Sequence, residues 1–281
     1  MNFIDGLYAK LEAWLWRKLG HGRRYTLLRI DFVRNMIVRW RRDYFIHRRK
    51  QLRIWDGEKS NIGKWEAGDA IQHNLQGLHD ISGCRGLRII RPLSIIETYR
   101  PLSQMPSRGG WYDLDYVCDA KVLDIGPRTE GEIFMLIGHG FKPQNIRGLD
   151  LISYSPLIDV GDMHAMPYAD DEFDIAIASC VLVYSANPRL ACAEMIRVTK
   201  NGGLICICQD TVPNAGDIAT AVLGKPLLRS DDYLALFGEH VDRIFYRHEI
   251  PERLKALTEP NEGSNYTMSL IFTVTKPGSL P

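Results

Sequence analysis

The second half of the chain alternates strand-like and helix-like segments, and this alternation limits the folds that the chain can adopt. Four apolar runs are typical of strands: Lys121–Ile125, Asn145–Leu151, Phe173–Ser179 and Gly203–Gln209. Helix-like segments lie between them at 131–139 and 188–200. Near-continuous apolar strings such as DIAIAS and GLICIC are typical of parallel strands covered on both faces. The pattern predicts an α/β fold with a doubly wound, mostly parallel sheet.

The C-terminal part adds three further elements. We expect a helix at 231–238 with Ser230 as its N-cap, because serine is a preferred residue at that position. Two strand-like runs follow, VDRIFYRHEI and YTMSLIFTVT.

The N-terminal segment differs in character from the rest. Apolar residues at helical spacing predict one helix over 3–19 and a second over about 25–50. The second carries an apolar stripe of Val33, Met36, Ile37, Trp40 and Tyr44. Residues 1–53 contain 14 Lys and Arg against 4 Asp and Glu, whereas the remainder contains 21 against 30. We therefore expect a basic helical extension over 1–110 and an α/β domain over 111–281.

Three interpretations of the basic extension remain open. The favoured one is a helical cap or homodimer arm that packs its apolar stripe on the body and leaves its arginines in water. The second is contact with a membrane surface, for which Trp14, Trp16, Trp40 and the arginines are suited. The third is nucleic-acid binding through the same charges. No recognised nucleic-acid motif supports the third, so nucleic acid is not an expected partner.

Composition narrows the class of protein. Apolar residues make up 45% and charged residues 25% of the chain, as in ordinary globular domains. The six cysteines form no CxxC pair and no metal-type cluster, so no metal is expected. The first residues do not resemble a secretory signal, and no apolar run has membrane-spanning length. We expect a cytoplasmic protein, with a peripheral position on the membrane as an open alternative.

The loop after the first predicted strand is the candidate ligand site. Ligands bind beyond the carboxyl ends of the strands in a doubly wound sheet. The string DIGPRTEGE places Asp124, Gly126, Pro127 and Thr129 there. Gly126 allows a sharp turn close to a ligand, and the helix that follows would present free N–H groups to an anionic group.

Acidic residues also follow the next two strands. Asp150, followed by Leu151, ends the second strand, where it can accept hydrogen bonds from the two hydroxyls of a ribose. Asp162 and Met163 lie where a base would sit, the carboxylate accepting from an exocyclic amine and the methionine packing on the ring. An α/β domain without a ligand would not explain these acids.

Five strings in this order carry a resemblance to a known family: VLDIGPRTEGE, GLDLISYS, GDMHAMPYADDEFD, VLVYSANP and RVTKNGG. Over about 90 residues they resemble the class I S-adenosylmethionine-dependent methyltransferases, in particular the small-molecule branch. The resemblance implies a Rossmann-like methyltransferase fold and S-adenosyl-L-methionine as the cofactor. It implies that Asp124 and Gly126 shape the loop beside the methionine part. It also implies that Asp150 holds the ribose, that Asp162 and Met163 bind the adenine, and that Cys180 lines the floor near the sulfonium.

The loop departs from the family pattern. Arg128 stands at the second loop glycine and Glu130 at the third. We expect that Arg128 does not copy a glycine's backbone freedom and instead pairs its guanidinium with the cofactor carboxylate. Glu130 or Glu132 could take the cofactor's ammonium group and would suit a helix N-terminus. We interpret the loop as a modified but working one.

The catalytic residues are less defined. Tyr184 stands where the family usually has a histidine, and it could orient an acceptor hydroxyl, cap the pocket or simply pack. His164 is the nearest candidate base in the sequence, or a loop histidine bonded to the backbone. Methyl transfer needs mainly alignment of the nucleophile, and a base only where the acceptor holds its proton tightly.

The sequence therefore predicts an enzyme that transfers a methyl group from S-adenosylmethionine to an oxygen or nitrogen of a small molecule or glycan precursor. One alternative is a non-catalytic binding or scaffold protein of the same fold, with its loop blocked by Arg128. Another is an enzyme of this fold that uses a different nucleotide cofactor. The affinity for S-adenosylmethionine separates these alternatives.

Overall fold

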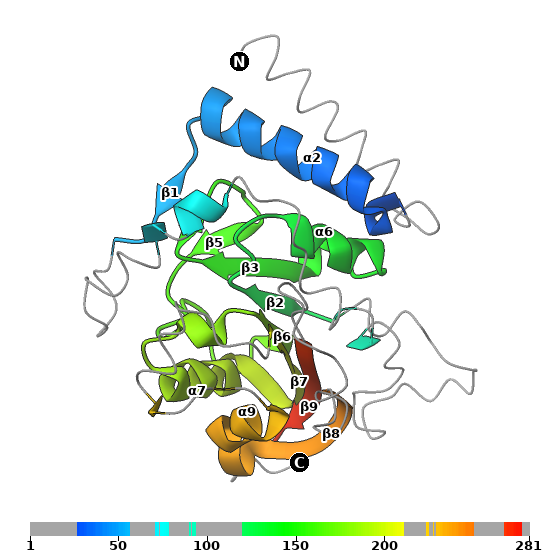
Figure 1. Ribbon diagram of the computed structural model, residues 1–281, viewed down its shortest axis with the longest axis vertical. Coiled ribbons are helices and arrows are strands. Elements are labelled where there is room, and N and C mark those ends of the chain that lie inside the picture. Colours follow the sequence, from blue (N-terminus) through cyan, green and yellow to red (C-terminus); the bar gives the residue numbers. More distant parts are fainter. Residues whose placement is uncertain are drawn as a thin grey trace, which may run out of the picture.

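A seven-stranded sheet forms the centre of the protein (Figure 1). The computed structural model describes residues 27–56, 71–72, 74–78, 90, 92–93, 120–210, 223–224, 227, 229–249 and 267–276. The helix predicted over 3–19 and the domain boundary expected at 110 lie outside these residues.

The strand order defines the fold. It is β5 (Ile158–Val160), β3 (Ile146–Asp150), β2 (Val122–Ile125), β6 (Phe173–Ser179), β7 (Thr199–Asp210), β9 (Thr267–Val274) and β8 (Val241–His248). The first five strands are parallel, and β9 runs antiparallel to both β7 and β8. The prediction of a doubly wound, mostly parallel sheet is confirmed.

Helices cover the two faces of the sheet. α6 (Gly131–Gly138) and α2 (Asp31–Asp43) pack on one face, and α7 (Pro188–Val198) and α9 (Ser230–Phe237) on the other (Figure 1). Alternate residues of β6 divide between the faces. Ile175 and Ile177 belong to the apolar cluster of α6, whereas Ala176 and Ala178 belong to that of α7 and α9. This burial on both faces explains the continuous apolar character of the strand.

The helix starts follow local capping rules. Asn187 caps α7, because its side-chain oxygen accepts a hydrogen bond from Leu190 N at 3.2 Å and Pro188 occupies the first helical position. For α9 the predicted N-cap is wrong by one residue. Ser230 is the first helical residue and Arg229 precedes it, with its N–H donating to Asp232 Oδ2 at 3.0 Å. An acidic residue in the first turn satisfies the start of the helix in place of serine.

Helix α2 buries only part of the stripe that the sequence predicts: Ile37 and Tyr44 are partly buried against the core. Arg34 and Arg41 are only 2% and 3% exposed, whereas Met36 and Trp40 of the predicted stripe are 53% and 40% exposed. The buried arginines are tolerated because their guanidinium groups find oxygen acceptors. The expected packing of the apolar stripe on the body is therefore wrong for Met36 and Trp40, and the expectation of arginines in water is wrong for Arg34 and Arg41.

The segment after α2 continues as a short π-helix, η2 (Tyr44–Arg48), and then joins the loops of the sheet. The strand β1 (Arg53–Ile54) pairs antiparallel with β4 (Ile152–Ser153), directly after β3. Arg53 Nη2 donates to the carbonyls of Ser155 and Ile158, both at 2.9 Å. The N-terminal segment is thus bonded to the loop that follows Asp150. In the described part of the chain, no helix is long and apolar enough to cross a membrane.

Candidate functional site

The strand order reverses between β2 and β6, and the loop after β2 lies at this switch point. Gly126 turns the chain there with φ +73°, and its N–H donates to Leu149 O at 2.8 Å. A Cβ atom at this position would lie 2.5 Å from Val181 Cγ2. Both the positive φ and the close approach therefore require glycine. Sheets of this kind bind ligands at this point.

Arg128 adopts the left-handed backbone conformation, with φ +53°. The expectation that it does not copy a glycine's backbone is therefore wrong, although an L-residue there carries a strain of about 1–2 kcal/mol. Its N–H donates to Asp150 Oδ2 at 2.8 Å, which helps to hold this conformation. Its guanidinium lies against Gly77, where an added Cβ would be 2.2 Å from Arg128 Nη1. Pairing of the guanidinium with a cofactor carboxylate stays a prediction.

Asp150 is buried at the end of β3 and both of its carboxylate oxygens accept hydrogen bonds. Oδ2 accepts from Arg128 N, and Oδ1 accepts from Asn74 Nδ2 at 2.8 Å and from Ile152 N at 3.3 Å. Burial raises the pKa of Asp150 to about 6, although these backbone N–H groups act in the opposite direction. Asn74 was not predicted as a site residue. It comes from residues 71–78, which carry no motif in the sequence.

Glu130 is bound by other side chains of the protein, which argues against its predicted role. Its carboxylate forms a bidentate pair with Arg41 of α2, at 2.7 Å to Nε and 2.8 Å to Nη2, and it also accepts from Ser155 Oγ at 2.5 Å. The Arg41 and Glu130 side chains are only 4% and 0% exposed. Arg41 also lies over the rings of Phe45 and Phe134, at 5.2 and 5.6 Å. Because its acceptor sites are filled by Arg41 and Ser155, Glu130 is unsuited to bind a cofactor ammonium.

Asp124 is fully buried, and in the described part of the chain its carboxylate oxygens accept from no backbone N–H and no cationic side chain. Burial raises its pKa well above the ordinary range, and the negative charge of Glu132, a carboxyl contact with Glu132 and the charge of Asp150 add to the rise. Such a contact between two carboxyls holds only if they share a proton. Three buried acids therefore converge beside the loop, and Glu132 is the glutamate that faces them.

The turn after β5 brings Asp162 beside Asp150, since Gly161 N donates to Asp150 O at 3.0 Å. His164 Nδ1 is 2.6 Å from Asp162 Oδ1, and its Nε2 is 2.6 Å from Ser185 Oγ. The ring is 8% exposed. A buried imidazole with both nitrogens engaged is poorly placed to take a proton from an acceptor, so the structure does not support His164 as a base. It connects the turn to the loop before α7.

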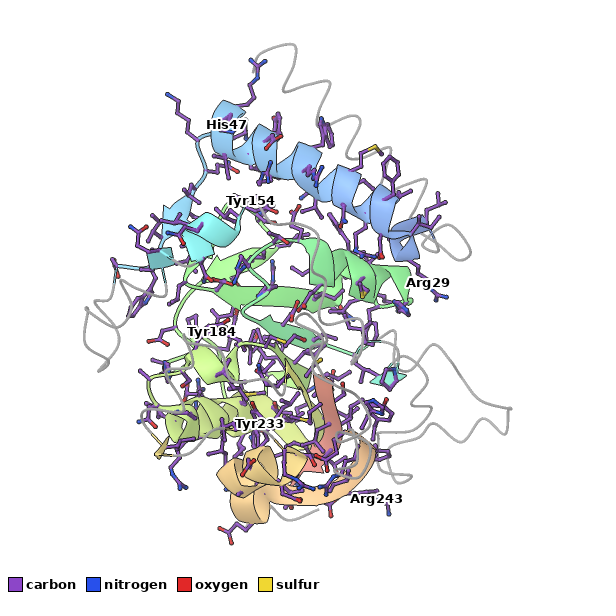
Figure 2. All side chains as sticks on the ribbon, in the orientation of Figure 1. Arg29, His47, Tyr154, Tyr184, Tyr233 and Arg243 are labelled. Carbon is purple, nitrogen blue, oxygen red and sulfur yellow. The ribbon has the colours of Figure 1, made fainter. Side chains whose placement is uncertain are left out.

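The other predicted residues line the same edge of the sheet. Cys180 has φ +55° directly after β6, and its N–H donates to Cys208 O at 2.7 Å. Tyr184 is half-buried in the 3₁₀ turn η5 (Leu182–Tyr184), near the start of α7 (Figure 2). The Leu151 carbonyl accepts from Trp55 N at 2.8 Å. The remaining positions are a buried Pro127, a buried Thr129 and a half-buried Met163. The ligand contacts of these residues stay predictions.

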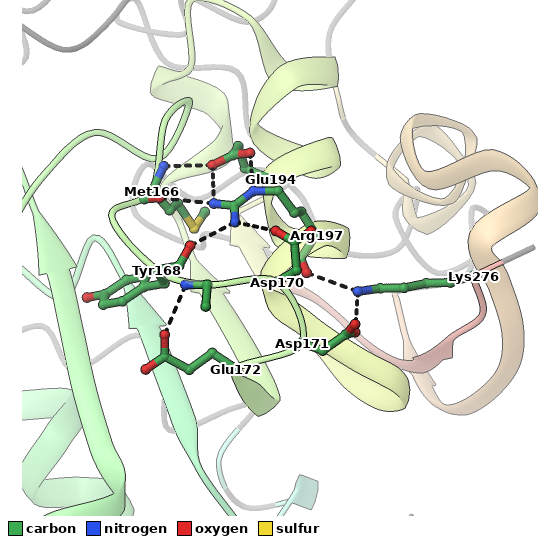
Figure 3. A network of polar contacts seen from close by, with 9 residues as sticks. Met166, Tyr168, Asp170, Asp171, Glu172, Glu194, Arg197 and Lys276 are labelled. Carbon is green, nitrogen blue, oxygen red and sulfur yellow. Dashed lines mark hydrogen bonds and ion pairs between the residues drawn. The ribbon is translucent and has the colours of Figure 1, made fainter. Parts of the chain in front are cut away.

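Arg197 of α7 fixes the turn that carries Asp162 and Met163 (Figure 3). Its guanidinium donates to the carbonyls of Met166 and Tyr168, at 3.0 and 2.7 Å. It also pairs with Glu194 at 2.7 Å, and Glu194 Oε2 accepts from Met166 N at 2.7 Å. The geometry of the turn is therefore set by protein contacts alone.

The acids at this edge fit part of the expected cofactor. The carboxylate oxygens of Asp124, next to Glu132, suit a group that brings a positive charge and N–H donors, such as the cofactor's ammonium. The fit at Asp150 is less direct, because Asn74 already donates to the carboxylate that would bind the ribose.

Comparisons with known proteins point to the same chemistry. Residues 141–207 match the model of the methyltransferase domain. The chain is 31% identical over 115 residues to a demethylmenaquinone methyltransferase of Renibacterium salmoninarum, covering 36% of this chain and 45% of the relative. It is 29% identical over 105 residues to a malonyl-[acyl-carrier protein] O-methyltransferase of Serratia marcescens, covering 36% and 40%. The chain thus spans less than half the length of these relatives.

A solved methyltransferase structure from Thermotoga maritima aligns with a TM-score of 0.41 at 13% identity, over 73% of this chain and 99% of the other. The fold is defined by the strand order and not by this alignment. Together with the strand order of the sheet, the match over residues 141–207 confirms the resemblance to methyltransferases that the sequence shows. The chain therefore shares its strand order and a methyltransferase-domain match with the class I S-adenosylmethionine-dependent methyltransferases, and S-adenosylmethionine is the cofactor that this resemblance implies.

Proposed function

We propose that this protein transfers the methyl group of S-adenosylmethionine to an oxygen or nitrogen of a small molecule or glycan precursor. One observation carries the proposal: the buried carboxyl of Asp124, which accepts from no N–H donor in the described part of the chain, lies beside a second acid, Glu132, at the switch point of the sheet. Two facing acids are unfavourable in an empty site and become favourable when a cation binds. A scaffold protein would have no need of this arrangement.

Each acid has a distinct role in the proposal. Asp124 and Glu132 hold the ammonium group of the cofactor, and Asp150 accepts from its ribose. Asp162 lies within the turn that would receive the adenine. The bound cofactor supplies a methyl group on a positively charged sulfur. The protein's contribution is then mainly alignment of the acceptor, for which half-buried Tyr184 is the candidate.

The proposal specifies the methyl acceptor only by its chemical class. The relatives named above act on demethylmenaquinone and on malonyl-[acyl-carrier protein], two acceptors of different chemistry. The second name specifies O-methylation, which supports oxygen as the methylated atom. A glycan precursor is the acceptor class that we would test first.

Calorimetric titration with S-adenosylmethionine and with its demethylated product tests the proposal. We expect saturable binding of both, and at least tenfold weaker binding by Asp124→Asn, about 1.4 kcal/mol, because a charge-assisted interaction with the ammonium is lost. Asp150→Ala should weaken binding by about 1–2 kcal/mol through loss of the ribose contacts.

A matched control is Asp174→Asn. Asp174 is also buried in the sheet, but it pairs with Lys121 N and Lys200 Nζ, both at 2.8 Å, at the opposite end of β6. The Asp174→Asn variant should bind the cofactor with the affinity of the unaltered protein. If neither compound binds to folded protein, the loop does not hold the cofactor and the scaffold alternative stands.

A further inference from the structure

The exposed apolar side chains of this protein gather in one region. Nine large apolar residues are exposed among those that the structure describes, and seven of them belong to residues 27–54. The seven are Leu27, Ile30, Phe32, Met36, Trp40, Leu52 and Ile54. Single exposed apolar residues need no explanation, but a concentration of this kind marks an interaction surface.

Three of these residues form a ridge along α2. Phe32, Met36 and Trp40 are spaced four residues apart, so they lie on one side of the helix. They are 76%, 53% and 40% exposed. The opposite side holds the buried Arg34 and Arg41, which bind oxygen atoms of the body or of α2 itself. The helix thus buries Val38 and two arginines against the body and presents a second apolar side outward, which an ordinary surface helix does not do.

The ridge is bordered by positive charge. Arg39 is exposed on α2, and the exposed run from His47 to Lys50 follows it directly. The two exposed acids of α2 are both in ion pairs, Asp31 with Arg34 at 2.5 Å and Asp43 with Arg42 at 2.7 Å. The surface of α2 and η2 is therefore apolar along its centre and cationic at its borders.

We propose that α2 and η2 bind the surface of an anionic lipid bilayer. The ridge of Phe32, Met36 and Trp40 enters the interfacial layer, and the basic side chains contact lipid phosphates. The rest of the chain supports this orientation, because residues 54–281 contain 21 basic against 30 acidic residues and are repelled by the same surface. The inference stands independently of the proposed methyl transfer.

Charge also argues against a second copy of the chain as the occupant. A twofold dimer formed through the ridge would bring the cationic border of one α2 against that of its partner, since both partners use the same patch. Like charges in contact disfavour that interface. Binding to nucleic acid would satisfy the charges but would leave the apolar ridge in water.

Co-sedimentation of the full-length protein with vesicles tests the proposal. We expect binding to phosphatidylcholine vesicles that contain a quarter of phosphatidylglycerol, little binding to pure phosphatidylcholine, and weaker binding at high salt. Phe32→Ser with Met36→Ser should reduce the affinity at least tenfold. Arg39→Ser with Arg48→Ser should reduce it by roughly fivefold per charge.

The controls are Ile244→Ser and Arg243→Ser. Ile244 is 41% exposed and Arg243 is also exposed, and both belong to β8, at the opposite end of the molecule from α2 (Figures 1 and 2). These variants should bind vesicles like the unaltered protein. Circular dichroism would show that all variants fold.

Three results would overturn the proposal. The first is equal binding to neutral and anionic vesicles, or binding to neither. The second is full binding by the Phe32→Ser, Met36→Ser variant. The third is a dimer in light scattering that this variant dissociates, since the ridge would then be covered by a second copy.

Discussion

Two buried glutamates lie two positions apart at the start of α6, and they are in opposite electrostatic environments. Glu130 is held by the Arg41 guanidinium and Ser155. Glu132 faces the carboxyl of Asp124 instead, which accepts from no N–H donor among the described residues. A buried charge is tolerated when it is paired, so the first glutamate is part of the framework. In the proposed function, the second lies where the cationic ammonium of the cofactor would bind.

Contacts of the buried residues explain how the loop after β2 keeps its shape with Arg128 and Glu130 in place of two glycines. Arg41 of α2 and Asp150 of β3 hold Glu130 and Arg128 from opposite sides of the loop. Helix α2 therefore supports the loop after β2 directly. The two kinds of buried acid should respond differently to substitution.

The largest effect is expected for Arg41→Met. This change leaves Glu130 buried without its counter-charge and removes the contacts with the rings of Phe45 and Phe134, so we expect a loss of about 3–5 kcal/mol in the free energy of unfolding. Urea denaturation measures it. The control is Arg247→Met, whose ion pairs with Asp231 and Glu249 are more exposed, for which we expect about 1 kcal/mol or less.

Adding Glu130→Gln to Arg41→Met should restore most of the lost stability, because no buried charge then lacks a partner. A double variant as unstable as the single one would show that packing, and not charge, makes Arg41 necessary.

The next effect is a pH dependence from Asp150. Its pKa rises from 3.8 to about 6 on folding, so the folded state binds the proton more tightly than the unfolded chain. The free energy of unfolding should therefore be highest below about pH 4 and fall as the pH rises through about 6, by about 3 kcal/mol from this group. Denaturation between pH 4 and 7 should show this decline relative to Asp150→Asn, which lacks the titrating group. Parallel profiles would contradict the assignment.

The smallest effect is expected for Asn74→Ala. Asn74 donates to the Asp150 oxygen that a ribose hydroxyl would use, so its removal should tighten cofactor binding by roughly fivefold, about 1 kcal/mol. The control is Gln76→Ala, an exposed neighbour in the same segment. Weaker binding by Asn74→Ala would mean that Asn74 positions Asp150 for the ribose and does not compete with it.

The sheet could be predicted well because its signals are local. Phe173–Ser179 matches β6 in full, and the other predicted strands differ from β2, β3 and β7 at their ends. The acids at 124, 150 and 162 were also found, since each follows or ends an apolar run. The short strands β1, β4 and β5 were missed, because strands of two or three residues leave no periodic pattern.

The partners of the site residues could not be predicted, because they come from distant positions. Arg41 and Glu130 are separated by 89 residues, and Asn74 and Asp150 by 76. Helical spacing predicted α2 but did not predict which side of the helix is buried. Arginines can lie on the buried side because their guanidinium groups find oxygen acceptors there. For the same reason, Arg34 and Arg41 were wrongly expected to be in water.

The contacts of Arg197 have a consequence for exchanging parts between related proteins. The turn at 162–172 reads in the sequence as a separate loop, but Arg197 and Glu194 of α7 hold its carbonyls and N–H groups. A chimera that imports this turn from another protein without α7 would lose its supports. The turn and the helix would have to be exchanged together.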